Sequence, residues 1–513
     1  MTGKHLYKKT SQLILFILFI TFILFANPVY SSNQIIDRHS LLVEFLRLTD
    51  KQPQWHQVER LRGLEAALNE LKYDGLNPNH YQLFRIQGLL DDELELSELS
   101  AAEDALISAV YLEAIADLML GRTRNLTVEV YLNYQRQRSN HFNQVVNHAI
   151  SYIDNPEQAL ALARPQVLDY NNLRVAYKRI ADKSAYAENL PVISPERPSL
   201  RVGMTDARVS LLRQHLLQPI PADNPDLYDQ ALSDLVKEFQ SQQGLEADGI
   251  AGPQTIARFN RTPEDDLKVV KVNLERWRRL NPSITESRVI ANIPSATLEY
   301  YQDNQLILST RTQVGRKDRK TPLMISEISH FTLNPTWTIP PTIYRNDKLP
   351  AIQNNPDYLQ SNRLSVLDTQ GNRLDTELID WSNPGAVILR QSAGPHNALG
   401  QVVIRFPNQQ SIYLHDTPSQ RLFDRQQRFF SSGCIRVEDA TQLVTLLLES
   451  TQSPQATQFD SLLSSGITRN VNIADPVTII LGYWTLRANE KGDIHIFTDI
   501  YDLDGDLLAA LEV

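Results

Sequence analysis

The spacing of apolar residues changes along the chain from a helical pattern to an alternating one near residue 288. Upstream, apolar residues recur every three or four positions in "VERLRGLEAALNELKYDGL" and "AEDALISAVYLEAIADLMLGR", which predicts helices that end at Gly75 and Gly121. Downstream, short stretches alternate with a period of two, which predicts strands bounded by turn residues. These stretches span residues 287–301, 305–315, 401–406 and 411–417. Helical spacing returns only at residues 437–450.

The length and these patterns predict a multi-domain α+β protein, because 513 residues exceed what one hydrophobic core usually organises. A linker rich in Pro and Ser separates the helical block from a compact unit with three short helices. From about 340 to 390 the sequence is rich in Asn, Asp and Pro and poor in strand signal, so we expect an inserted capping segment. The expected boundaries are 1–31 for a signal peptide or N-terminal anchor, 33–190 for a helical scaffold, 197–260 for the three-helix module, 287–485 for the β-rich domain and 486–513 for a C-terminal extension.

The N-terminus has basic residues, then an apolar run from Leu13 to Ala26, then two serines. This order is that of a secretory signal. The run of about fourteen residues is short of the roughly twenty that cross a bilayer, although an uncleaved anchor stays open. We therefore expect an exported protein, either free or tethered to a membrane.

The net charge of -10 argues against a sequence-independent grip on nucleic acid. Such a grip needs a dense basic face that releases counterions from phosphates, and no Lys/Arg stripe is found in the sequence. We expect no nucleic-acid partner.

Cys434 is the only cysteine of the chain. In an oxidising compartment structural cysteines usually pair, and a lone one cannot pair within its own chain. The alternatives are an inert buried thiol, an intermolecular disulfide and a reactive thiol.

The neighbours of Cys434 favour the reactive thiol. In a strand over residues 411–417, Tyr413 and His415 share one face. Gly433 permits a close backbone approach. A helix expected directly after Cys434 would place the thiol near a helix N-terminus, which favours the thiolate.

These residue types form a cysteine nucleophile with a histidine base, and the N–H groups of Gly433 and Cys434 are candidates for an oxyanion hole. Asp416 could orient the imidazole by its side chain or by its carbonyl. With 11 histidines in the chain, a chance pairing of Cys434 with His415 stays open on the residue pattern alone.

No other motif predicts a site. Asp502, Asp504 and Asp506 have the spacing of a calcium loop, but the expected ligand at the twelfth position is missing, so a turn is favoured. The remaining histidines have no paired ligand spacing, and we predict no metal and no cofactor. Trp337 is expected to be a core residue and not a substrate platform.

Two segments carry family resemblances. Residues 197–260 resemble the peptidoglycan-binding domain that is appended to many wall hydrolases, through "LRVGMTDARVSLLRQHLL" and "VKEFQSQQGLEADGIAGPQTI". Residues from about 288 to 447 resemble the L,D-transpeptidases with a YkuD-type catalytic domain, in which a histidine on a strand precedes a Ser-x-Gly-Cys run. The matching stretches are "SIYLHDT" with "FFSSGCIRVEDA", and "TQVGRKDRKTP", "LNPTWTIPP" and "RQSAGPHNALG".

The second resemblance implies catalytic roles at four positions. Cys434 is the nucleophile, His415 is the base, and the carbonyl of Asp416 orients the histidine. Gly433 and Cys434 donate to the oxyanion.

The same resemblance implies three residues on the substrate side. Tyr413 lines the pocket, and Arg436 has a supporting or substrate-facing role. Ser432 stands where many members of the family have histidine. Members of the long periplasmic subgroup, which also have a scaffold and a capping insertion, tolerate this serine.

The implied activity is an L,D-transpeptidase of the periplasm that forms 3→3 cross-links between diaminopimelate residues of peptidoglycan, from a donor tetrapeptide stem and an acceptor stem. Acylation of the thiol by carbapenems is implied as well. An L,D-carboxypeptidase or a lipoprotein-attaching enzyme is the alternative within the class. A non-catalytic wall-binding scaffold is the alternative outside it.

Overall fold

The computed structural model describes residues 36–91, 99–124, 138–184, 190–196, 198–355 and 357–512. The expected signal peptide or anchor at 1–31 lies outside these ranges. Residues from Arg38 onward form one compact unit. None of its described helices has the length and apolar character that crossing a membrane requires.

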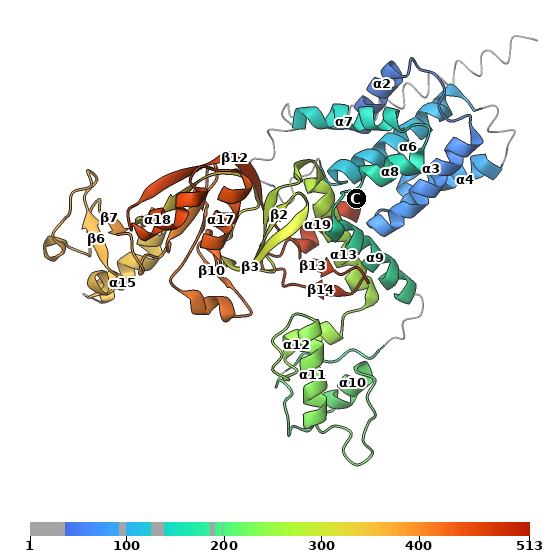
Figure 1. Ribbon diagram of the computed structural model, residues 1–513. Helices are drawn as coiled ribbons and strands as arrows, with labels where there is room; N and C mark the ends of the chain where they lie inside the picture. Colours follow the sequence, from blue (N-terminus) through green and yellow to red (C-terminus); the bar gives the residue numbers. More distant parts are fainter. Residues whose placement is uncertain are drawn as a thin grey trace, which may run out of the picture. The chain divides into compact units, whose positions relative to one another are not determined.

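The N-terminal part is helical, as the periodicity predicted (Figure 1). The longest of its helices, α6 (Ala101–Leu120), begins with a capping box in which Ser100 and Glu103 satisfy each other's backbone N–H groups, and it ends at Gly121. Gly75 adopts a left-handed conformation after η1 (Leu71–Asp74), which ends the first predicted helix. The other helices are α2 (Arg38–Leu48), α3 (Val58–Glu70), η2 (Pro78–Tyr81), α4 (Leu83–Asp91), α7 (Arg138–Ser151), α8 (Pro156–Ala163) and α9 (Leu168–Ser184).

The module after the linker consists of three short helices, which confirms the prediction for this segment. They are α10 (Arg208–His215), α11 (Gln230–Gln242) and α12 (Pro253–Phe259). Pro253 stands in the first turn of α12, where its missing N–H costs nothing. The core is small, with Val209, Leu232 and Val236 fully buried and Phe239 stacked on Phe259.

Helix α13 (Pro263–Leu280) connects the helical part with the β-rich part. Trp277 and other apolar residues of α13 belong to the same buried cluster as the main sheet and helix α9. The helix also buries charges: Glu275 and Arg278 have fully buried side chains and form an ion pair at 2.8 Å. Glu275 accepts further hydrogen bonds from the N–H and Oγ1 of Thr123, each at 2.7 Å. These buried bonds tie the N-terminal helices to α13.

The β-rich part is built on a nine-stranded mixed sheet with the order β10-β3-β11-β9-β8-β4-β12-β1-β2, in which β3 also pairs with β2. The strands are β1 (Arg288–Asn292), β2 (Thr297–Gln302), β3 (Gln305–Gly315), β4 (Met324–Leu333), β8 (Val402–Arg405), β9 (Leu414–His415), β10 (Phe429–Ser431), β11 (Ile435–Val437) and β12 (Arg469–Gly482). Helix α17 (Ala440–Ser450) and the short elements η7 (Gln420–Asp424), η8 (Ala456–Gln458) and α18 (Phe459–Ser464) complete this part. The four alternating stretches of the sequence correspond to β1 with β2, to β3, to β8 and to β9.

The segment at 340–390, expected as a capping insertion from a stretch with a poor strand signal, contains strands. β5 (Trp337–Thr338), β6 (Leu364–Leu367) and β7 (Ile388–Gln391) form a separate sheet in the order β5-β7-β6. Short helices α14 (Pro341–Ile343), α15 (Leu349–Asn354) and α16 (Tyr358–Ser361), a single π-helical turn η5 (Tyr344–Lys348) and η6 (Thr376–Leu378) complete it. Its own apolar cluster contains Ile352, Val366 and Leu389. Strands of two to four residues are too short for their alternation to stand out in a sequence.

The C-terminal residues pack against the main sheet. They form β13 (Leu486–Ala488), β14 (Ile494–Ile496) and α19 (Asp504–Glu512). Asp504, one of the three aspartates at calcium-loop spacing, is the first residue of α19 and pairs with the buried Arg276 at 2.7 Å. This pairing gives the aspartate a structural role.

Candidate active site

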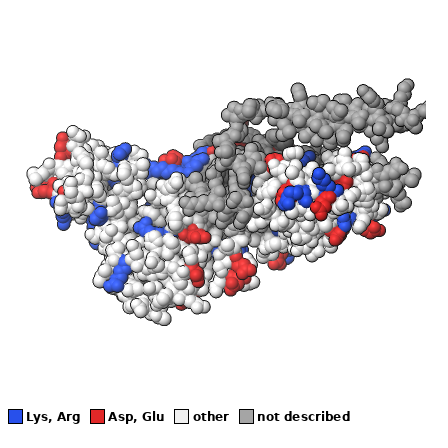
Figure 2. All heavy atoms as spheres, turned by 90° about the horizontal axis from the view of Figure 1, so that it is seen from above, with Lys and Arg blue, Asp and Glu red and all other residues white. Residues whose placement is uncertain are grey.

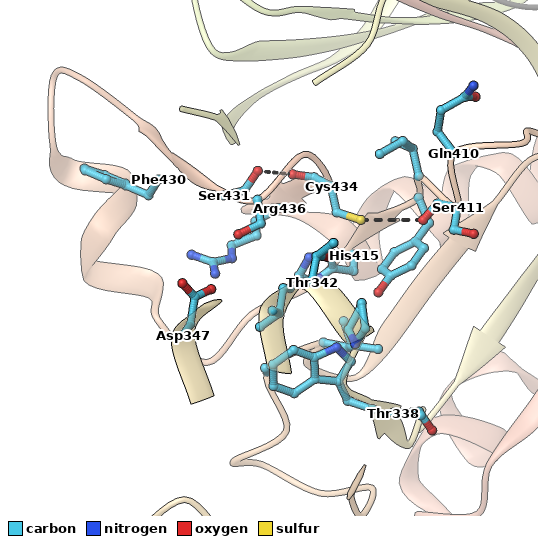
Figure 3. Close-up of a pocket in the computed structure, with 18 of the residues that line it drawn as sticks. Thr338, Thr342, Asp347, Gln410, Ser411, His415, Phe430, Ser431, Cys434 and Arg436 are labelled. Carbon is cyan, nitrogen blue, oxygen red and sulfur yellow. Dashed lines mark hydrogen bonds between the residues drawn. The ribbon is translucent and has the colours of Figure 1, made fainter. Parts of the chain in front are cut away.

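Cys434 and His415 line the same cavity of about 630 Å³ (Figure 3). Most of its walls come from three places: residues 336–348 at the start of the insertion, residues 410–415 before and on β9, and residues 430–436 around the cysteine. Arg316, Ala398, Leu399 and Arg405 complete them. In Figure 3 His415 lies beside the side chain of Cys434, whose Sγ contacts the carbonyl oxygen of Ser411 at 3.9 Å. The lone thiol and the strand histidine thus share one cavity.

His415 is held in one tautomer by its neighbour in sequence. Its Nδ1 lies 2.6 Å from the carbonyl oxygen of Asp416. A carbonyl oxygen can only accept, so Nδ1 carries the proton and the lone pair is on Nε2. The imidazole is 5 % exposed. This geometry is what a general base needs.

The carboxylate of Asp416 makes hydrogen bonds away from the imidazole. Its oxygens accept from the N–H groups of Gln401 at 2.8 Å and Thr417 at 2.7 Å. A Cβ at Gly400 would stand 2.2 Å from Asp416 Oδ2, so only glycine fits there. The sequence left open whether the side chain or the carbonyl of Asp416 faces the imidazole, and the structure places the carbonyl there.

Burial lowers the pKa of His415 to about 3; the positive charge of Arg436 adds to this effect, and the bond to the Asp416 carbonyl opposes it. Burial also raises the pKa of the Cys434 thiol, against the opposing influence of Tyr413 and the positive charge of Arg436. The resting site therefore holds a neutral thiol beside a neutral imidazole.

The prediction of a helix directly after Cys434 was wrong. The residues that follow form strand β11, and α17 begins at Ala440. β11 lies between β9 and β3, which buries Ile435 and Val437 and overrides the helical pattern. No helix N-terminus lowers the thiol pKa, so the expected thiolate is not favoured at rest.

Arg436 is placed beside the histidine by strand pairing. β11 runs parallel to β9, and Arg436 is in register with His415. Its Nη1 donates to Gln313 Oε1 at 3.0 Å, while its buried Nε has no hydrogen-bond partner among the described residues. Burial lowers the pKa of Arg436. The positive charge of Arg436 lowers the pKa of the Cys434 thiol, so a cation here would stabilise a thiolate at this position.

The two candidate oxyanion donors differ. Gly433 has a φ of +117°, which only glycine adopts readily. Its N–H is donated to Ser431 Oγ at 3.1 Å. The N–H of Cys434 makes no hydrogen bond within the described part of the chain, so it is the donor that is free in this structure.

Ser432 is exposed and is held by a residue that the sequence did not single out. Arg319 Nη1 donates to Ser432 Oγ at 3.0 Å. The same guanidinium donates to both carboxylate oxygens of Asp347 in the insertion, from Nη2 at 2.8 Å. Arg319 therefore links the cysteine loop to the insertion.

Aromatic and basic side chains complete the walls. The ring of Tyr413 contacts the His415 ring edge-on at 5.6 Å, and the guanidinium of Arg405 lies 5.3 Å from the Tyr413 ring. Trp337 packs against the cluster of the insertion but also lines the cavity, so the core prediction for it is right only in part. Lys348 lies 5.9 Å from the Trp337 ring.

The residues that sequence reasoning missed are Arg319, Asp347, Arg405 and Lys348. Arg319 lies in "TQVGRKDRKTP", a stretch already singled out, but nothing in it tells which of its basic residues bonds to Ser432 and Asp347. Asp347 is one of many acidic residues in the insertion. Only the fold brings them to the site.

Outside the site, the surface carries charged side chains of both signs. On the face drawn in Figure 2, basic and acidic side chains are interspersed, and the coloured residues of that face form no continuous basic surface. Within the residues that the structure describes, no group of three His, Cys, Asp or Glu side chains is arranged to hold a metal ion.

Comparison with known families identifies three domains. Residues 286–476 match the L,D-transpeptidase catalytic domain, residues 40–176 match a scaffold domain, and residues 208–259 match the family described as "putative peptidoglycan binding domain". The chain therefore carries a YkuD-type L,D-transpeptidase catalytic domain together with a scaffold domain and a peptidoglycan-binding domain.

A curated relative from Haemophilus influenzae, named "Putative L,D-transpeptidase", is 39 % identical over 255 residues, which are 49 % of this chain and 51 % of the relative. The chain thus matches about half the length of this relative. Among solved structures, an L,D-transpeptidase from Mycobacterium smegmatis is 15 % identical, with a TM-score of 0.17 over 38 % of this chain and 58 % of that one. L,D-transpeptidase 1 from Mycobacterium tuberculosis is 14 % identical, with a TM-score of 0.15 over 38 % and 60 %.

Proposed function

We propose that the protein is an L,D-transpeptidase that forms 3→3 cross-links between diaminopimelate residues of peptidoglycan through a thioester on Cys434. The observation that carries the proposal is the pairing of the lone thiol with a histidine whose unprotonated Nε2 shares its cavity. The proposed setting is the periplasm, reached through the N-terminal leader, which either is cleaved or stays as a tether.

In the first step Cys434 Sγ attacks the carbonyl carbon of the L-centre of diaminopimelate in a donor tetrapeptide stem. The thiol proton moves to His415 Nε2 as the Sγ–C bond forms, since both groups are neutral at rest. The negative oxygen of the tetrahedral intermediate accepts from the Cys434 N–H. When the C–N bond breaks, the terminal D-alanine leaves as the amine and takes the proton from His415.

In the second step the side-chain amine of a diaminopimelate in an acceptor stem attacks the thioester. The amine passes a proton to His415 Nε2, the C–S bond breaks, and the sulfur takes that proton back. The product is the cross-linked dimer, and the site returns to its resting state. The peptidoglycan-binding domain supports the choice of peptidoglycan stems as donor and acceptor.

Water or a lipoprotein amine as the resolving nucleophile would give an L,D-carboxypeptidase or a lipoprotein-attaching enzyme from the same thioester. A non-catalytic wall-binding scaffold would form no thioester at all. The base geometry of His415 supports an enzyme over the scaffold.

Incubation of the full-length protein with disaccharide tetrapeptides, followed by chromatography and mass spectrometry of the muropeptides, separates these outcomes. We expect 3→3 dimers and released D-alanine. Disaccharide tripeptides without dimers would indicate the carboxypeptidase, and unchanged substrate would contradict an enzymatic role. The Cys434→Ala variant is the control that should form no product.

A further inference from the structure

The peptide unit between Gly433 and Cys434 is held from outside the cysteine loop. Thr321 Oγ1 donates to the carbonyl oxygen of Gly433 at 2.8 Å and accepts from the N–H of Gly315 at 2.9 Å. Thr321 is 1 % exposed, so water does not compete for these bonds.

This carbonyl belongs to the same peptide unit as the N–H of Cys434. A trans peptide unit is planar, and its C=O and N–H point in opposite directions. The bond from Thr321 therefore fixes the direction of the Cys434 N–H, which points away from Thr321. Gly433 has no Cβ and a φ of +117°, so its own backbone would not restrain this plane.

Tyr501 holds Thr321 in turn. Its hydroxyl accepts from the N–H of Thr321 at 2.8 Å and donates to the carbonyl oxygen of Gly315 at 2.7 Å. The N–H of Tyr501 is itself donated to Tyr483 Oη at 2.8 Å. Tyr501 is 3 % exposed and lies in the C-terminal extension, beyond the residues 286–476 that match the catalytic domain.

Gly315 completes this support, because the chain doubles back on itself there. A Cβ at Gly315 would lie 2.4 Å from the carbonyl oxygen of Arg319 and 2.5 Å from the N–H nitrogen of Thr321. The close approach lets the hydroxyls of Thr321 and Tyr501 bond to both polar groups of one glycine. Each bond of the series is buried or partly buried and has good length.

We propose that Thr321 and Tyr501 are positioning residues that aim the Cys434 N–H at the oxyanion formed when Cys434 is acylated. The inference rests on the proposed acyl transfer through Cys434, and it makes the C-terminal extension part of the machinery. Neither side chain touches the substrate; both act through the Gly433–Cys434 peptide unit.

The test compares two reactions of the same thiol in the full-length protein. Acetylation by p-nitrophenyl acetate passes through an oxyanion: Sγ bonds to the carbonyl carbon, p-nitrophenolate leaves, and the thiol proton passes through His415 to solvent. Alkylation by iodoacetamide displaces iodide from a CH₂ group and forms no oxyanion. We expect Thr321→Val to lower the acetylation rate about tenfold to hundredfold, while alkylation stays within about twofold.

Thr321→Ser, which keeps the hydroxyl, should restore acetylation to within about threefold of wild type. Tyr501→Phe should lower acetylation selectively in the same way, and it serves as the readout if Thr321→Val does not fold. The matched control is Tyr300→Phe, which removes a hydroxyl bonded to Ser450 at 2.7 Å in the same domain and should leave both rates unchanged.

Equal acetylation rates in Thr321→Val, Tyr501→Phe and wild type would overturn the inference. A parallel fall of acetylation and alkylation would also overturn it, because that result indicates general distortion of the loop. A wild-type protein that is acetylated by the ester but leaves muropeptides unchanged would contradict the proposed function alone, since the ester test does not use peptidoglycan.

Discussion

At the scale of single residues, the thiol of Cys434 and the imidazole of His415 are both neutral at rest. Burial keeps His415 unprotonated and keeps Cys434 a thiol. Arg436 is in register with the histidine on the neighbouring strand. A preformed thiolate–imidazolium pair would need the opposite shifts of both pKa values. In the proposed mechanism the charge would therefore develop only during attack, where the Cys434 N–H and Arg436 can stabilise it.

The first prediction concerns pH. With the thiol pKa above its ordinary value, the thiolate fraction should rise about tenfold per pH unit between pH 6 and 8, and alkylation by iodoacetamide should follow it. Cys434 is the only cysteine, so loss of the thiol reports on this residue without background. A rate plateau between pH 5 and 7 would contradict the account, because it would indicate a preformed ion pair.

The second prediction concerns acylation at low pH. Since the pKa of His415 is lowered to about 3, the base stays unprotonated as the pH falls from 8 to 5. The profile of kcat/KM should therefore have no acid limb near the ordinary histidine value of about 6.5. Such a limb would mean that the imidazole is not buried as described.

At the scale of elements, the insertion is joined to the cysteine loop by one guanidinium. Arg319 contacts Asp347 of η5 and Ser432 beside the nucleophile. The insertion has its own sheet and its own apolar cluster. In the described structure the Arg319 contacts connect it to the cysteine loop.

Asp347→Asn should weaken this link without touching the nucleophile. We expect faster amide hydrogen exchange in residues 337–348 and a KM for the donor stem raised about two- to fivefold, since a partly exposed ion pair is weak. The alkylation rate of Cys434 should not change. The matched control is Asp380→Asn, in the same insertion, whose carboxylate bonds to Ser382; equal exchange in both variants would contradict the link.

Individual elements show which parts of the fold and of the candidate site the sequence predicts. The residue pattern left the pairing of Cys434 with His415 open, and the family resemblance implied it. The structure places both residues on one cavity, and their catalytic roles stay predictions. The helix after Cys434 was predicted wrongly, because β11 gains its hydrogen bonds from β9 and β3, which local periodicity does not report. Strands β4 and β12 pair along nine positions in the middle of the sheet, yet their alternation was not singled out.

At the scale of the whole molecule, α13 joins the scaffold to the catalytic sheet. Its apolar side shares one cluster with α9 and with the sheet, and its polar side carries the buried pair of Glu275 and Arg278. The spacing of α13 predicts a helix, but no sequence pattern predicts that its charges are buried. Their partners come from the helical part, more than a hundred residues upstream.

The Glu275→Gln variant should reveal how much the buried ion pair with Arg278 contributes to stability. It leaves Arg278 buried without its carboxylate, which should lower the free energy of unfolding by about 3–5 kcal/mol. Trp277, stacked on Trp484 at 4.3 Å, provides the fluorescence signal for a urea titration. Glu264→Gln on the same helix removes an exposed charge and should leave the titration unchanged. Identical curves for the two variants would contradict a buried ion pair.

The central claim is that Cys434 carries the acyl group between donor and acceptor. Its most direct measurement is the intact mass of the protein, quenched in acid seconds after mixing with a tetrapeptide donor in the absence of an acceptor. We expect a mass gain equal to the donor minus D-alanine, mapped to Cys434, and no gain in Cys434→Ala. An adduct that persists in Cys434→Ala, or product formed by that variant, would contradict the central claim.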